Sequence, residues 1–185
     1  MPEGLRWHGY RDRLGFAAAV LLLSPGGVSS TASSTQSLAA SITPIAKLTV
    51  PATATMTSGS TQFRPFQASV SISYRARSTP SGGGSITARV TSDFSPTGGP
   101  SAAAGALSYT CSGAMLGAAC SGTQAASTTS QTPVLTLPSS ACTGGGGACS
   151  SADPNSVNLT FTLTDDPGYA TGIYSARITF TISAT

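Results

Sequence analysis

Apolar and polar side chains alternate with a period of two along much of the chain after residue 44. In residues 68–75, Val70, Ile72 and Tyr74 alternate with serines, and residues 157–163 alternate in the same way. A period of two puts one set of side chains on each face of a β-strand. These segments are therefore predicted to be strands with one buried face.

Further segments of the same kind are separated by turns rich in glycine and proline. They cover residues 45–50, 85–91, 107–111, 134–137 and 174–182. Short strands with this punctuation are typical of sandwiches and barrels, and no segment after residue 44 has helical periodicity. We expect an all-β fold, an Ig-like antiparallel β-sandwich of about 7–9 strands. The last two strands, joined by a turn at residues 165–168, are expected to pair with each other.

The first residues have a different pattern. Arg6, Arg11 and Arg13 precede an apolar run over residues 14–23, which is followed by Ser-Pro-Gly-Gly. This order is typical of a secretory signal peptide. The alternative is a retained membrane anchor, but ten apolar residues make a helix of about 15 Å against roughly 30 Å of hydrocarbon. We therefore expect a signal peptide helix that is removed.

Three segments follow from these patterns. Residues 1–32 are the expected signal peptide, residues 33–43 a flexible arm rich in Ser, Thr and Ala, and residues 44–185 the β-sandwich domain. Cleavage is expected after the small residues that end at Ala32, or at a second site that ends at Ala40. The protein is then secreted, to the periplasm or the extracellular surface, with no membrane span after cleavage.

Charge is scarce in this chain. Charged residues make up 8% of the sequence, against about a quarter in an average soluble domain. The basic residues after the leader are scattered, whereas nucleic-acid binding needs a basic patch. Partners of the nucleic-acid class are therefore not expected.

The residue types needed for catalysis are also scarce. The only histidine, His8, lies in the predicted leader, so serine nucleophiles have no imidazole base, and Lys47 is the only lysine. The adjacent Asp165 and Asp166 precede Pro-Gly and are interpreted as turn formers. A calcium site there, with Asp153 or Asp93, is the alternative. We expect no enzymatic activity, no resident metal and no cofactor.

Four cysteines follow the predicted leader: Cys111, Cys120, Cys142 and Cys149. An even number in a secreted chain predicts two disulfides. Three connectivities are open, and pairing of neighbours, Cys111 with Cys120 and Cys142 with Cys149, is favoured because each closes a short loop. A zinc site is the alternative, but its ligand pairs are usually separated by two to four residues, and here eight and six intervene.

Residues 172–185 resemble the closing strand of bacterial surface subunits of the fimbrial and spore coat protein U types. In chaperone–usher pilins, a glycine fourteen residues from the C-terminus opens a strand of alternating apolar residues, and Gly172 holds that place. The alternating residues that follow it are Tyr174, Ala176, Ile178, Phe180 and Ile182.

The resemblance implies an Ig-like fold that lacks one strand and is completed by an N-terminal arm from the next subunit. Such β-strand addition takes its affinity from backbone hydrogen bonds and its specificity from alternate side chains. The candidate donor residues are Leu38, Ala40 and Ile42, which alternate before Pro44. The expected function is that of a non-enzymatic structural or adhesive surface protein, a pilus-like subunit that associates with itself or with another surface subunit.

Two other functions fit the same composition. The domain could be a self-contained secreted Ig-like module whose loops bind a glycan or a surface protein, or an envelope protein with no ligand. Glycan-binding faces usually present exposed aromatics, and the only tryptophan, Trp7, lies in the leader. Long strand edges with few charged residues to protect them favour assembly.

Overall fold

The computed structural model describes residues 36–58, 63–79, 81–139, 141 and 154–185. The contacts divide the chain into Met1–Ala39 and Ala40–Thr185, and the second unit is compact by itself. The predicted signal peptide lies outside the described residues. Those residues contain no apolar helix of membrane-spanning length.

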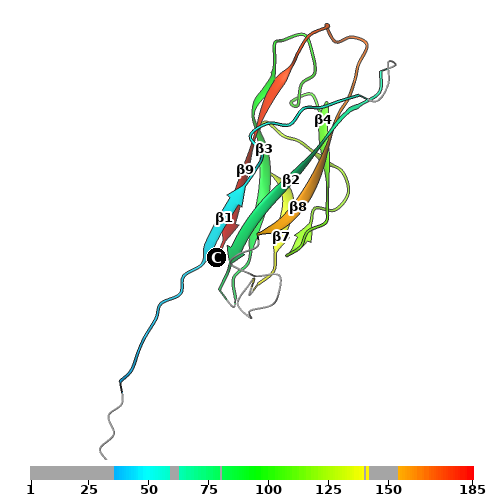
Figure 1. Ribbon diagram of the computed structural model, residues 1–185. Helices are drawn as coiled ribbons and strands as arrows, with labels where there is room; N and C mark the ends of the chain where they lie inside the picture. The colour runs from blue at the N-terminus through cyan, green and yellow to red at the C-terminus, as the bar shows by residue number, and fades with distance from the viewer. Residues whose placement is uncertain (1–35, 59–62, 80, 140, 142–153) are drawn as a thin grey trace, which may run out of the picture. The chain divides into compact units, whose positions relative to one another are not determined.

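Nine strands in the described residues form two antiparallel sheets (Figure 1). Sheet A has the order β1 (Ile45–Thr49), β2 (Phe66–Arg77), β8 (Asn155–Leu163), β4 (Leu107–Ser112) and β6 (Gln124–Ala125). Sheet B has the order β5 (Ala118–Ala119), β7 (Thr132–Leu137), β3 (Gly84–Ser95) and β9 (Ser175–Ala184). The prediction of an all-β antiparallel sandwich is confirmed.

The core lies between the two sheets and follows the alternation in the sequence. In sheet A, Val70 pairs with Leu159 and Ile72 with Val157, and all four side chains are buried. Sheet B contributes the buried side chains Ile86, Ala88, Val90, Val134, Leu135 and Leu137. The serines and threonines between these positions face outward, as the period of two requires.

The expected pairing of the last two strands is wrong. β8 lies between β2 and β4 in sheet A, whereas β9 pairs with β3 in sheet B. Residues 164–174 therefore cross from one sheet to the other. Alternation identifies the buried face of a strand but not its neighbour, and both edges of β8 are already paired.

A β-bulge lets proline enter a paired strand. The expected strand over residues 134–137 begins earlier, at Thr132, and includes Pro133. Ile86 pairs with Leu135 and Thr87 with Pro133, so the register passes over Val134. Bulges are a usual place for proline in a sheet, because proline has no N–H for the ladder.

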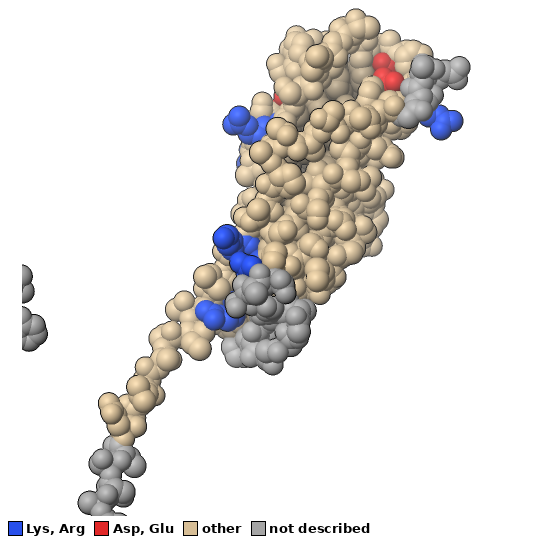
Figure 2. Space-filling model, viewed as in Figure 1, with Lys and Arg blue, Asp and Glu red and all other residues tan. Residues whose placement is uncertain are grey.

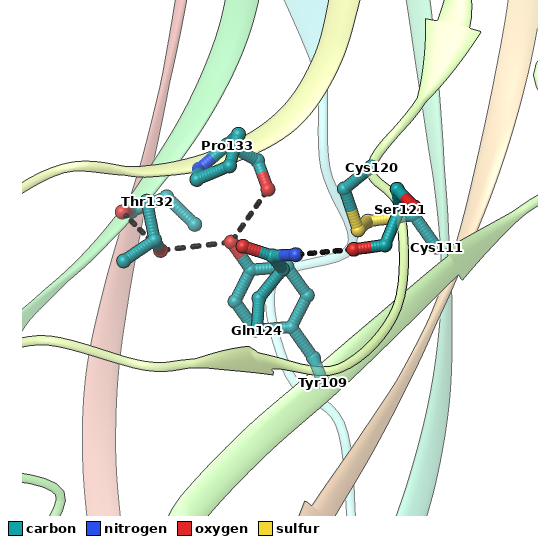
Figure 3. The surroundings of a disulfide bond; sticks show 8 residues. Tyr109, Cys111, Cys120, Ser121, Gln124, Thr132 and Pro133 are labelled. Carbon is teal, nitrogen blue, oxygen red and sulfur yellow. Dashed lines mark hydrogen bonds between the residues drawn. A yellow bond between two sulfur atoms is a disulfide. The ribbon is translucent and has the colours of Figure 1, made fainter.

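One disulfide joins the two sheets (Figure 3). Cys111 belongs to β4 of sheet A, and Cys120 follows β5 of sheet B, with their Cα atoms 5.3 Å apart. This pairing confirms the prediction for the first two cysteines. Cys142 and Cys149 lie outside the described residues.

The Tyr109 hydroxyl lies in the surroundings of this disulfide and links β4 to β7 (Figure 3). It is 2.8 Å from Oγ1 of Thr132 and 2.9 Å from the carbonyl oxygen of Pro133. Burial raises the pKa of Tyr109, and its hydrogen bond with Thr132 opposes that rise. The phenol therefore stays neutral in the ordinary pH range and bridges the sheets as a hydrogen-bonding group.

Asp93, near the end of β3, organises the connection to β4. Its carboxylate accepts hydrogen bonds from the N–H groups of Phe94, at 2.8 Å, Ala102, at 2.7 Å, and Ala103, at 3.3 Å. It also accepts one from the hydroxyl of Ser101, at 2.7 Å. Partial burial tends to raise the pKa of Asp93, but these four hydrogen bonds outweigh it and the pKa is lowered. The anion is therefore a structural acceptor.

Removal of the inter-sheet disulfide should destabilise the domain. For the double variant Cys111→Ala/Cys120→Ala we expect a loss of about 2–3 kcal/mol in the free energy of unfolding, because the unfolded chain regains the conformational entropy that the closed loop removes. Denaturant unfolding in the same buffer checks this value. An unchanged midpoint would show that the bond contributes nothing to stability.

Asp93 should make stability depend on acid pH. A carboxyl whose pKa is lowered by folding contributes its full stability above its unfolded value, 3.8, and loses it as the pH falls through the folded value. Asp93→Asn should cost about 1–3 kcal/mol at pH 7 and flatten the dependence below about pH 4. Asp166→Asn, at a carboxylate that accepts a hydrogen bond from one N–H only, is the control for unfolding curves measured between pH 2 and 7.

Candidate functional site

The two sides of the sandwich, where the sheets end, are closed by different contacts. On one side the Cys111–Cys120 disulfide ties sheet A to sheet B. On the other side lie the edge strands β1 and β9, which are in contact across the sheets. In the described part of the chain, β1 pairs only with β2 and β9 pairs only with β3. We call the side formed by β1 and β9 the open side.

The inward-facing side chains of β9 are less buried than the side chains of β3 with which they pair. Ile178, Phe180 and Ile182 pack against the core but are only partly buried. Their direct partners in β3, which are Val90, Ala88 and Ile86, are 2%, 3% and 0% exposed. Neighbouring positions of one ladder therefore differ because, in the described residues, β9 has a pairing partner on one edge only.

The other edge strand shows the same incomplete burial. Leu48 of β1 is partly buried, whereas its partner Tyr74 in β2 is 1% exposed. Val50, just after β1, is partly buried as well. Apolar side chains from both sheets thus line the open side, and a further strand added there would cover them.

Two of the predicted assembly-strand residues lie before the strand itself. β9 begins at Ser175, so Gly172 and Tyr174 belong to the connection from β8. The Tyr174 hydroxyl donates to the carbonyl oxygen of Ala170 at 2.6 Å, and its ring lies so close to Gly99 that a Cβ there would be 2.2 Å from it. Tyr174 therefore holds the corner of the chain that leads into β9. A Cβ on Gly172 would meet only ordinary contacts, so the structure gives no steric reason for glycine there.

The remaining predicted residues of the assembly strand have the inward orientation that the alternation predicts. Ala176, Ile178, Phe180 and Ile182 all share the inward face of β9, and the residues between them are exposed. The outward neighbours Thr179 and Thr181 belong to the polar outer face of sheet B. The strand thus offers an apolar face and a free backbone edge together.

The predicted donor residues lie in a segment without regular structure. Residues 36–44 belong to no strand, Leu38 is 92% and Ile42 is 72% exposed, and Ala40 is exposed as well. The Arg77 guanidinium at the end of β2 donates to the carbonyl oxygen of Thr43, with Nη2 at 2.8 Å. Sequence reasoning missed this contact, because it depends on the pairing of β1 with β2.

The candidate chemical groups do not gather into a reaction centre in the described residues. Asp166 accepts a hydrogen bond from the Gly168 N–H at 2.7 Å, which fits the predicted turn. Lys47 lines a shallow depression with Thr49, Ser73 and Arg75 on the outer face of sheet A. No group of three or more metal-ligating side chains occurs in the part of the chain that is described.

No family model, curated protein or solved structure matches this chain.

The free edge of β9 should be visible in hydrogen exchange. In an antiparallel edge strand, alternate N–H groups point away from the only neighbour. In the monomer we expect those amides of β9 to exchange about a hundredfold faster or more than the amides of β8, which has neighbours on both sides. Residue-resolved exchange by NMR checks this. Uniform protection along β9 would mean that its edge is already covered.

Proposed function

We propose that this protein is a secreted, non-enzymatic structural or adhesive subunit of the cell surface, which assembles as pilus-like subunits do, by β-strand addition. The observation that carries the proposal is the incompletely buried inward row of β9 beside the fully buried row of β3. An added strand would bury that row and pair with the free backbone edge of β9. The disulfide supports the extracytoplasmic part of the proposal, because such bonds persist in oxidising compartments.

The arm has the length needed to be that strand. Residues 33–43, if extended, span about 36 Å, and the ten residues of β9 span about 33 Å. The arm also has the required alternation, since Leu38, Ala40 and Ile42 would share one face as an extended strand. The arm of a second copy could therefore follow β9 along nearly its full length.

Burial of the arm supplies a driving force of reasonable size. A leucine or isoleucine side chain that moves from water into an apolar site gains about 1.5–3 kcal/mol, and Leu38 and Ile42 are both strongly exposed. Backbone hydrogen bonds along β9 would add affinity, as in other cases of strand addition. The ordering of a flexible arm opposes this gain.

A self-contained module that binds a glycan or a surface protein is the second candidate. The observation that favours it is the exposure of Phe63, which is 63% exposed, and of Ile173, which is 92% exposed. Both lie outside the strands, at positions where loops bind ligands in many domains. This function requires no association between copies.

Association through the arm is tested with a substitution on its apolar face. The chain from residue 33 should form oligomers that grow with concentration, and Leu38→Asp/Ile42→Asp should remain monomeric because the charged residues cannot enter the apolar open side. Size-exclusion chromatography with light scattering measures both. The matched control is Ser37→Asp/Ser41→Asp, which adds the same charge to the opposite face of the arm and should still assemble.

A stable monomer for the unsubstituted chain would contradict strand addition and favour the self-contained module. So would oligomers that persist unchanged in Leu38→Asp/Ile42→Asp. These outcomes report on association and not on folding, because the two substituted residues are exposed and lie outside the core.

A further inference from the structure

Three cationic side chains lie together on the outer face of sheet A. In the ladder of β1 with β2, Lys47 is directly opposite Arg75, and Arg77 follows two residues later on the same face of β2. The described part of the chain has six lysines and arginines, so half of these cations occupy one small area. Figure 2 shows blue side chains gathered in this region. We call Lys47, Arg75 and Arg77 the basic patch.

The direct pairing of Lys47 with Arg75 opposes folding. Like charges that lie opposite each other on neighbouring strands repel and destabilise the pair of strands. The next pair on the same face, Thr49 with Ser73, is uncharged and has no such cost. An anion bound between the two cations would turn their repulsion into affinity, because both would then attract the same negative group.

The carboxylates of the described residues lie elsewhere. Asp93 accepts the hydrogen bonds that hold its own connection, after β3 of sheet B. Asp165 and Asp166 follow β8 at the end of sheet A where β2 begins, and Arg75 is nine residues further along β2, roughly 30 Å away. Asp153 lies outside the described residues, so its effect is tested below by substitution and not argued from its position.

The basic patch borders a depression of about 230 Å³. Its lining residues are Lys47, Thr49, Ser73, Tyr74, Arg75 and Pro154. Ammonium and guanidinium groups only donate hydrogen bonds, and the hydroxyls of Thr49 and Ser73 can donate as well. These donors fit a group that only accepts, which is a sulfate, phosphate or carboxylate. The depression is smaller than the roughly 300–1,000 Å³ of small-molecule pockets, so it suits one such group and not a whole ligand.

The surroundings of the depression favour a polysaccharide as the carrier of that group. Beyond Ser73, the outer face of sheet A continues with uncharged Ser71, Ser156 and Asn158, which can exchange hydrogen bonds with sugar hydroxyls. A nucleic acid would require a longer basic stripe, and an anionic membrane attracts clusters of about four to eight cations. The outer face of β1 and β2 has no aromatic side chain on which a neutral sugar could stack. A charged sugar is therefore the class that fits.

We infer that this depression is an oxyanion-binding subsite for an anionic polysaccharide, which Lys47 and Arg75 contact directly. Arg77, whose guanidinium holds the carbonyl oxygen of Thr43, adds positive potential beside it. The inference deepens the adhesive part of the proposed function, on which its choice of a surface polymer rests. A strand added at the open side would cover the inward row of β9 and not the outer face of sheet A. Binding and assembly are therefore separable.

Titration of a short dextran sulfate into the chain from residue 33, at a concentration below assembly, tests the subsite. Calorimetry should show binding that weakens with salt, and neutral dextran of the same length should not bind. Lys47→Gln/Arg75→Gln should weaken the affinity about tenfold, because two partly exposed ion pairs are lost. The matched control is Arg64→Gln/Arg177→Gln, which removes the same charge from two exposed positions outside the patch and should have a much smaller effect.

Two further variants separate charge from structural damage. Lys47 is exposed, so Lys47→Gln leaves the core intact. It should weaken binding about threefold while the unfolding midpoint stays the same or rises, because the repulsion from Arg75 is removed. A lowered midpoint would contradict the opposed pair on which the inference stands. Asp153→Asn should bind at least as tightly as the unsubstituted chain, since the ligand is negative, and weaker binding there would overturn a site for an anion alone.

Three results would overturn the inference. They are no binding of dextran sulfate, equal losses in the patch variant and its control, and equally tight binding of a DNA duplex of the same charge. Inorganic sulfate that binds as tightly as the polymer, per sulfate group, would assign the depression to a free ion and also overturn it.

These results are distinct from a failure of the proposed assembly. Lys47→Gln/Arg75→Gln should still form the oligomers of the unsubstituted chain, as measured by light scattering. If the arm of residues 33–43 drives assembly but dextran sulfate does not bind, the subsite is wrong and strand addition stands. If the chain is a stable monomer that binds dextran sulfate through the basic patch, strand addition is wrong and the subsite stands.

Discussion

The antiparallel pairing of β2 with β8 is the contact on which the rest of the sandwich depends. These two strands occupy neighbouring positions within sheet A, and their register over nine pairs places every inward side chain beside another inward side chain. A slip of one residue would turn all of these apolar groups toward water. The opposite sheet packs on this surface, so its strands gain their buried faces from the same register.

That core is completed on one side only. The disulfide and the Tyr109 hydroxyl tie the sheets together near β4, β5 and β7. At β1 and β9 the same two sheets end in partly buried apolar side chains and free backbone edges. Long edges of this kind are usually protected by charged residues or by a covering segment, and here the surface has little charge. A strand supplied from outside is the covering that we propose.

The arm and the free edge of β9 both have a direction along the domain. The arm directly precedes β1, and the free edge of β9 runs from Ser175 to Ala184. Backbone pairing alone would accept an arm in either direction. The side chains that meet along the pair then decide the direction.

The sequence alone indicated the seven longer strands and their buried faces and favoured the first disulfide, but it did not predict β5 and β6. Period-two alternation fixes which side chains of a strand point inward, as at Val157 and Leu159, and the short loop between Cys111 and Cys120 favoured their pairing over the two other connectivities. The candidate inward row of β9 was visible for the same reason. In contrast, the corner role of Tyr174 depends on Gly99 and Ala170, which approach it only after folding.

Tertiary structure decided the neighbours. Alternation carries no information about which strand lies beside which, so the sequence favoured a pair of β8 with β9 that the sandwich does not form. The same limit hid the contact of Arg77 with Thr43, the position of Pro133 in a bulge, and the open side itself. An edge exists only once the order of strands is set, because burial depends on the partners that a strand finds and not on its own pattern.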